Sequence, residues 1–147
     1  MATAIDNLWP ADIAATEGAE APIAILKQQA SLLGQTTKNL VEAIVETKAT
    51  DYARHMEHWF VLVAPALNFY RYPLFSVRHH AVKMYPVTIV DQSMFEKKAD
   101  GASQEITAND ESQFKEMLRN IFAHKETKSI VGALVAQSTA SGFVAVQ

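Results

Sequence analysis

Histidines have the most versatile chemistry of this chain near neutral pH, and four of the five fall in two short segments. His55 and His58 flank Glu57, whereas His79 and His80 are adjacent. Imidazole and carboxylate groups together bind metal ions or transfer protons. In regular strands each histidine pair would point to opposite faces, so a shared site requires a cross-strand register that the spacing leaves open. Because structural histidines are commoner than metal ligands, we predict no metal ion and no cofactor.

The segment 69–85, which we call the basic aromatic window, is the second region of unusual chemistry. It contains Arg71, Arg78 and Lys83, several aromatic rings and no acidic residue. In a regular strand, alternate residues from Tyr70 to Arg78 share one face. Such a surface stacks bases and neutralises phosphate or forms a protein interface, unless its rings pack in the core. The residues predicted to bind a ligand or partner are Tyr70, Arg71, Tyr72, Arg78, His79, His80 and Lys83.

Several enzyme classes leave compact signatures that this sequence lacks. Its five glycines form neither G-x-G-x-x-G nor G-x-x-x-x-G-K-[ST], and neither G-x-S-x-G nor H-E-x-x-H occurs. The absence of cysteine excludes disulfides, thiolate metal sites and cysteine nucleophiles. The sequence therefore favours a non-enzymatic protein.

Composition indicates one domain. The chain has 147 residues, of which 49% are hydrophobic, and a net charge of -3. A sequence pI of about 5.9 argues against strong nucleic-acid binding, which is typical of domains with a pI above about 9. No apolar run reaches the roughly 20 residues of a membrane span, and neither a secretory signal nor a glycosylation acceptor is visible. We predict a cytoplasmic protein without membrane contact.

Residues 1–20 form a predicted acidic arm that is partly ordered. The arm has acidic residues and no Lys or Arg to offset them. Trp9 is a large apolar side chain in this polar setting, so we expect it to pack against something. Its own domain is the simpler site for that contact, and a second subunit or another partner is the alternative.

The first half of the domain is predicted to be one helix followed by a sheet. Pro22 suits the first turn of a helix over 21–34, and Gly34 suits a left-handed C-cap. Pro65 ends a nearly continuous apolar run, and Pro73 suggests a strand edge or a bulge. Short gaps between the strands favour antiparallel neighbours. The predicted strands are 40–48, 55–64, 68–79 and 82–90.

The second half is predicted to be mainly helical. The polar segment 91–109 is either a mobile loop or a small hairpin that turns at Asp100-Gly101. Asp110 and Gln113 have the spacing of a capping box, and an apolar stripe follows them. That stripe, which we expect to pack in the core, is Phe114, Met117, Leu118, Ile121 and Phe122. Thr127 suits the cap of a further helix over 126–137, although a strand is also possible there. The remaining residues, 138–147, are predicted to be a flexible or docked tail.

These patterns together predict an α+β domain over residues 21–137. It comprises an N-terminal helix, a four-stranded antiparallel meander and one or two C-terminal helices on one sheet face. Phrases at 22–29 and 85–89 resemble those of small bacterial and phage proteins, and this resemblance implies no fold, substrate or site. The favoured function is a non-enzymatic interaction module that associates with itself and regulates, inhibits or sequesters a partner. The alternatives are a nucleotide or small-ligand binder that uses the basic aromatic window, and a histidine–carboxylate enzyme or metal-binding protein.

Overall fold

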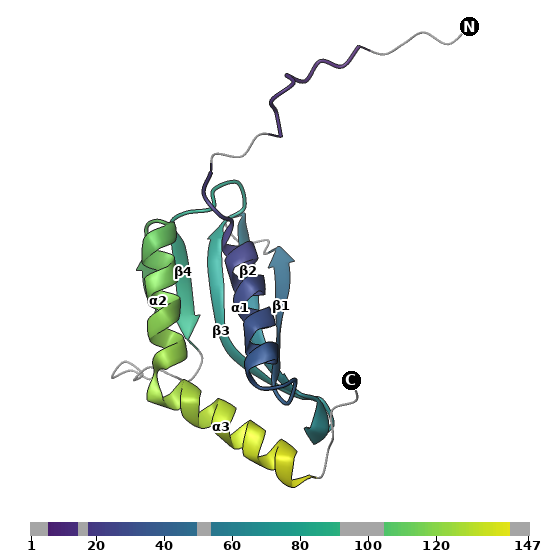
Figure 1. The fold of residues 1–147 in the computed structure, drawn as a ribbon. Coiled ribbons are helices and arrows are strands. Elements are labelled where there is room, and N and C mark those ends of the chain that lie inside the picture. The colour runs from purple at the N-terminus through teal and green to yellow at the C-terminus, as the bar shows by residue number, and fades with distance from the viewer. Residues whose placement is uncertain (1–5, 15–17, 50–53, 92–104, 142–147) are drawn as a thin grey trace, which may run out of the picture.

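The structure is a computed structural model that describes residues 6–14, 18–49, 54–91 and 105–141. Figure 1 shows the described elements as one layer of strands with helices against it. In chain order they are α1 (Pro22–Thr36), β1 (Glu42–Ala49), β2 (His55–Ala64), the short 3-10 helix η1 (Pro65–Leu67), β3 (Tyr70–His80), β4 (Val87–Asp91), β5 (Glu105–Ala108), α2 (Glu111–Ala123) and α3 (Lys125–Ala140). The predicted α+β class is confirmed.

The sheet is an antiparallel meander in which every strand pairs with its neighbours in the sequence. It has five strands rather than the predicted four. The additional strand, β5, lies at the end of the polar segment and pairs with β4, with Val87 opposite Ala108. Four residues are too few to establish a recognisable alternating pattern, which is why β5 was missed. The predicted turn at Asp100-Gly101 lies outside the described residues.

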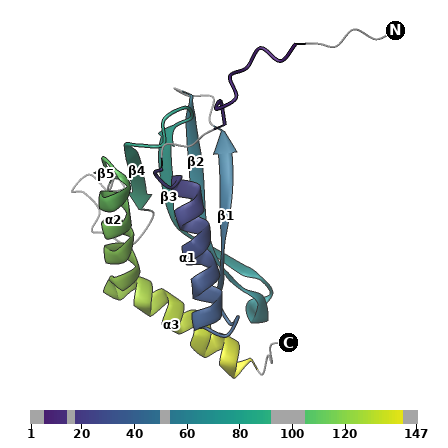
Figure 2. The same cartoon turned by 45° about the horizontal axis from the view of Figure 1, so that its top comes forward.

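All three helices lie on the same side of the sheet, as Figures 1 and 2 show from two directions. The core fills the space between the two layers. At its centre the rings of Phe60 and Phe75 stack with centroids 5.2 Å apart, and Phe122 of α2 approaches both. Ile25 and Leu26 of α1 are buried against this cluster. Aromatic stacking of this kind adds about 0.5–1.5 kcal/mol per pair to the burial of the rings themselves.

The ends of the helices follow local chemistry, with two corrections. At α2, Asp110 accepts from the Gln113 backbone N–H at 2.8 Å, so the predicted cap is confirmed. Gly34 is not the predicted left-handed cap, because α1 continues to Thr36 and the left-handed residues come later. The cap of α3 is His124, whose Nδ1 accepts from Glu126 N–H at 3.1 Å. Thr127 instead lies inside α3 and donates to a backbone carbonyl of α2.

A register shift in the pairing of β2 with β3 bends the middle of the sheet. Phe60 pairs with Phe75, but the next residue, Val61, pairs with Pro73, so Leu74 is an extra residue in β3. Of the two alternatives predicted at Pro73, a strand edge or a bulge, the structure shows a bulge at the neighbouring Leu74. Proline lacks the N–H that a regular ladder requires, which explains its position beside the bulge.

Two predicted boundaries differ in the structure. The fourth strand begins at Val87 rather than at Val82, which is 82% exposed in the turn before β4. The predicted start of the C-terminal tail falls within α3, which extends to Ala140. The described helices are all too short or too polar to cross a membrane.

Candidate functional site

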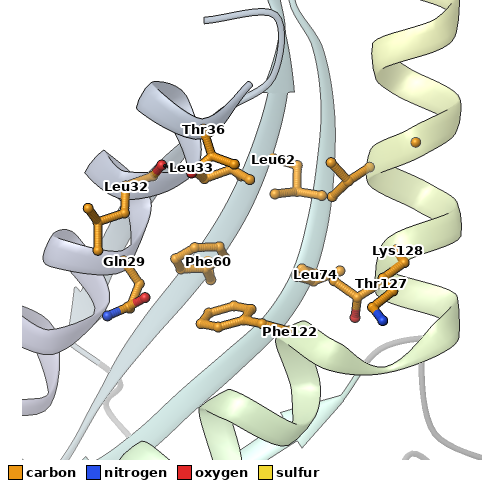
Figure 3. Close-up of a pocket in the computed structure, with 12 residues that line it drawn as sticks. Gln29, Leu32, Leu33, Thr36, Phe60, Leu62, Leu74, Phe122, Thr127 and Lys128 are labelled. Carbon is orange, nitrogen blue, oxygen red and sulfur yellow. Dashed lines mark hydrogen bonds between the residues drawn. The ribbon is translucent and has the colours of Figure 1, made fainter. Parts of the chain in front are cut away.

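A pocket opens on the helix side of the sheet, where α1 and α3 diverge (Figure 3). Phe60, Leu62 and Leu74 of the sheet form its floor, and Phe122 closes it at the end of α2. Its volume is about 460 Å³. The other lining residues are Gln29, Leu32, Leu33 and Thr36 of α1 with Thr127, Lys128, Val131 and Gly132 of α3. A volume of this size lies within the range of about 300–1,000 Å³ that is typical of ligand sites.

The pocket exists because α2 and α3 are separate helices rather than one continuous helix. His124, between them, has an extended backbone with ψ of 142°, so α3 leaves in a new direction. Figure 2 shows α3 turning away from α2 and passing below α1. The helix layer therefore leaves a pocket above the floor, where Phe60, Leu62 and Leu74 are only 1–2% exposed. Leu32 on the rim is 49% exposed.

A second pocket of about 590 Å³ lies between α1 and α2. It shares Gln29 and Phe122 with the first pocket, and we call the two neighbouring pockets together the helix groove. Its other lining residues are Ile25, Gln28, Lys115, Leu118, Arg119 and Ala123.

The charged residues that line the helix groove are all cations, namely Lys115, Arg119 and Lys128. Hydrogen bonds with Glu111 and then with Glu20 raise the pKa of Lys115, and Arg119 pairs with Glu116 beside the groove. An apolar lining with cations at its sides suits an apolar occupant whose negative charge can share or replace these carboxylate partners.

Two histidines meet beneath the helices. His58 of β2 is 2% exposed and His79 of β3 is 8% exposed, and their Nε2 atoms are 2.9 Å apart. Nδ1 of His58 lies 2.8 Å from the hydroxyl of Thr47, whereas Nδ1 of His79 lies 2.8 Å and 3.0 Å from the carbonyls of His80 and Lys83. We call His58 and His79 the histidine pair.

The hydrogen bonds assign one neutral state to the histidine pair. Carbonyls only accept, so Nδ1 of His79 carries a hydrogen and its Nε2 accepts from Nε2–H of His58. Nδ1 of His58 then accepts from the Thr47 hydroxyl. Burial, followed by the neighbouring His79, lowers the pKa of His58 to about 4. At neutral pH His58 is therefore uncharged, and each ring nitrogen of the pair is bonded inside the protein.

The remaining histidines and Glu57 do not join this pair. His55 pairs with His80 on the opposite sheet face, and their rings meet edge to face with centroids 6.1 Å apart. His55 and His58 thus point to opposite faces, as do His79 and His80, and both arrangements agree with the prediction for regular strands. Within the described chain, no three groups of His, Asp or Glu lie close enough together to hold a metal ion.

The basic aromatic window is divided between the two sheet faces. The bulge at Leu74 reverses the alternation, so Tyr70 and Tyr72 lie on the helix side and Ser76 and Arg78 on the opposite side. The expectation that these residues share one face is wrong, because it assumed a regular strand. Tyr70 is 49% exposed, and Tyr72 packs against the core.

The cations of the window have varied surroundings. Arg71 donates to Glu46 at 2.6 Å, and this hydrogen bond lowers the pKa of that carboxyl. Arg78 lies 3.7 Å from Glu57, and Lys83 is exposed in the turn before β4. His79 is enclosed within the histidine pair. Binding of a ligand or partner by these residues remains a prediction.

Among the residues that the structure describes, Trp9 has no packing site on its own domain. Its side chain is 69% exposed, and its neighbour Leu8 is 91% exposed. The simpler expectation for Trp9 is therefore wrong, while the alternative of a partner stays a prediction.

Sequence reasoning did not identify the helix groove. Its floor consists of ordinary core residues that are 1–2% exposed, and the pocket above them depends on the angle between α2 and α3. The one available signal was Leu32, an additional leucine on the margin of the α1 apolar face. Comparisons of the chain with protein-family models, curated proteins and solved structures found no match.

Proposed function

We propose that the chain is a non-enzymatic interaction module that associates with itself through the helix groove. The observation that supports this proposal is the groove's apolar lining, in which Leu32 on the rim is 49% exposed above a buried floor, together with cations and no carboxylate among its lining residues. Covering such a surface is favourable by about 25 cal/mol for each Å² of apolar area removed from water. A protein segment is long enough to follow both pockets.

The two alternatives have weaker support. Nucleotide binding by the basic aromatic window is less favoured because Tyr70 and Tyr72 lie on the opposite sheet face from Arg78, so ring and cation do not form one surface. A histidine-based enzyme needs an imidazole that reaches its substrate, whereas both members of the histidine pair are buried and satisfied. A structural role explains the pair more simply.

Sedimentation equilibrium over a wide concentration range tests self-association. Val131→Glu introduces a carboxylate into the groove lining, and we expect association to weaken about tenfold or more, equivalent to about 1.4 kcal/mol. Val82→Glu is the matched control, because Val82 is highly exposed in the turn before β4 and does not line the groove. Thermal melts confirm that both variants fold. A wild-type chain that remains monomeric at every concentration overturns the proposal.

A further inference from the structure

We propose that the occupant of the helix groove is the N-terminal arm of a second copy of this chain, with Trp9 and its apolar neighbours seated in the groove. This inference rests on the proposed function and names its partner. It joins two features of the described residues: an apolar-lined groove with Leu32 exposed on its rim, and an arm whose large apolar side chains are more than half exposed.

The arm presents its apolar groups in a compact arrangement. Leu8, Trp9 and Ile13 are 91%, 69% and 59% exposed. The N–H of Ile13 donates to the Pro10 carbonyl at 3.1 Å, which closes a turn between Trp9 and Ile13. The Trp9 N–H is bonded to the Asn7 side chain at 3.1 Å. Large apolar side chains held by such local bonds lose less conformational freedom when they bind.

The charges of the arm and of the groove are complementary. Residues 1–20 contain no Lys or Arg, and Asp6, Asp12 and Glu17 precede Glu20, which binds Lys115 of its own domain. The charged groove residues are Lys115, Arg119 and Lys128. Complementary charges steer encounter and orient the bound segment, while the apolar side chains supply most of the affinity.

The arm leaves the domain at one end of the groove. The backbone N–H of Glu20 donates to the Glu111 carboxylate at 2.6 Å. The carboxylate of Glu20 itself lies 3.3 Å from Lys115 and 2.9 Å from the Gln28 amide. Tyr85 donates to the Glu20 carbonyl at 2.9 Å. The root of the arm is thus attached beside two groove residues, Gln28 and Lys115.

The direction and length of the arm favour binding to the groove of a second copy rather than to the groove of the same chain. Figures 1 and 2 show the described part of the arm beyond the end of α1, pointing away from the helices. The seven residues that connect Ile13 to Glu20 span at most about 25 Å. That reach is comparable to the length of about 22 Å expected for the fifteen residues of α1. An arm can therefore cover the groove of an adjacent molecule, and a two-fold pair makes the contact twice.

The first experiment removes the apolar groups from the full-length arm. In the variant Leu8→Ser/Trp9→Ser/Ile13→Ser, we expect the dimer dissociation constant measured by sedimentation equilibrium to rise at least about tenfold. Val82→Ser, which removes another exposed apolar side chain, is the control and should leave it unchanged. If the arm variant associates as tightly as the wild type, the arm inference is wrong while self-association stands. A monomeric wild type refutes both proposals.

The second experiment mixes two defective chains. The arm variant retains an intact groove, and Val131→Glu retains an intact arm, so each supplies what the other lacks. We expect a one-to-one heterodimer from the mixture, with a single arm–groove contact, at concentrations where each variant alone is monomeric. A mixture that stays monomeric at a concentration about a hundredfold above the wild-type dissociation constant contradicts the exchange of arms.

A fluorescence measurement separates the second copy from the chain's own arm. Trp9 and Trp59 are the two tryptophans, so Trp59→Phe leaves Trp9 as the reporter. We expect Trp9 emission to shift to shorter wavelength as concentration rises through the association range. A shifted emission that persists unchanged in the dilute monomer would show that the arm occupies its own groove, and would overturn the inference.

Discussion

The histidine pair gives the stability of this protein a defined dependence on pH. His58 is 2% exposed, and burial and His79 together lower its pKa to about 4 from an ordinary value of 6.5. Between these values the unfolded chain binds a proton at His58 and the folded chain does not. Unfolding therefore takes up a proton in this range, and stability falls as the pH is lowered from 6.5 towards 4.

The size of this effect follows from the two pKa values. Each pH unit between them corresponds to about 1.4 kcal/mol, so the full contribution is about 3 kcal/mol. Above pH 6.5 the imidazole is neutral in both states, and the contribution is complete. Below pH 4 it is protonated in both, and the contribution is lost. The expected slope approaches 1.4 kcal/mol per pH unit between these limits.

His58→Gln removes this titration and retains the hydrogen bonds. The amide oxygen of glutamine accepts from the Thr47 hydroxyl, and its NH2 group donates to Nε2 of His79, replacing the bonds of His58. We expect urea unfolding at a series of pH values to show that the stability of the variant falls less steeply between pH 6.5 and 4. The slope should be smaller by about 1.4 kcal/mol per pH unit, which corresponds to one proton. His80→Gln, on the opposite face, controls for the loss of an imidazole.

Parallel stability curves for wild type and His58→Gln between pH 6.5 and 4 would refute this reasoning. They would mean that His58 binds its proton equally well in the folded and unfolded chains. The enclosed hydrogen-bonded pair would then not describe the protein in solution.

Three further predictions concern stability, measured by urea unfolding at pH 7. Phe75→Ala removes a fully buried ring stacked on Phe60 and should cost about 3–5 kcal/mol, and a loss below about 1 kcal/mol would contradict the central aromatic cluster. Asp110→Ala should cost about 1 kcal/mol because the Gln113 N–H loses its cap, whereas Asp110→Asn should retain most of that stability. Gly132→Ala should add about 0.5–1 kcal/mol, since the added Cβ meets no atom within 4 Å and alanine favours the helix; a destabilised variant would contradict that open space.

Features that depend on neighbouring residues were readable from the sequence. Pro65 ends β2 because a proline cannot donate within the ladder, and Asp110 caps α2 at the spacing expected from Gln113. The short connections between strands led directly to the antiparallel meander. In each case the cause and its effect lie within a few residues of each other.

Features that depend on register or on helix angles were not readable. One extra residue at Leu74 exchanges the two faces of the strand. Tyr72 and Arg78 therefore lie on opposite faces, although an even number of positions separates them in the sequence. The contact between His58 and His79 depends on the same cross-strand alignment. The helix groove depends on the turn at His124, where a small backbone change redirects the whole of α3.

The first strand of the sheet bears on how copies of this protein meet. Among the described residues β1 pairs only with β2, so its other edge has backbone groups open to a further strand. Glu42, Glu46 and Lys48 lie along this edge strand. Charged side chains on an edge discourage the stacking of strand upon strand that leads to fibrils. The addition of strands from further copies to this edge of the sheet is therefore unfavourable. Copies that assemble are expected to do so through closed contacts elsewhere on the surface.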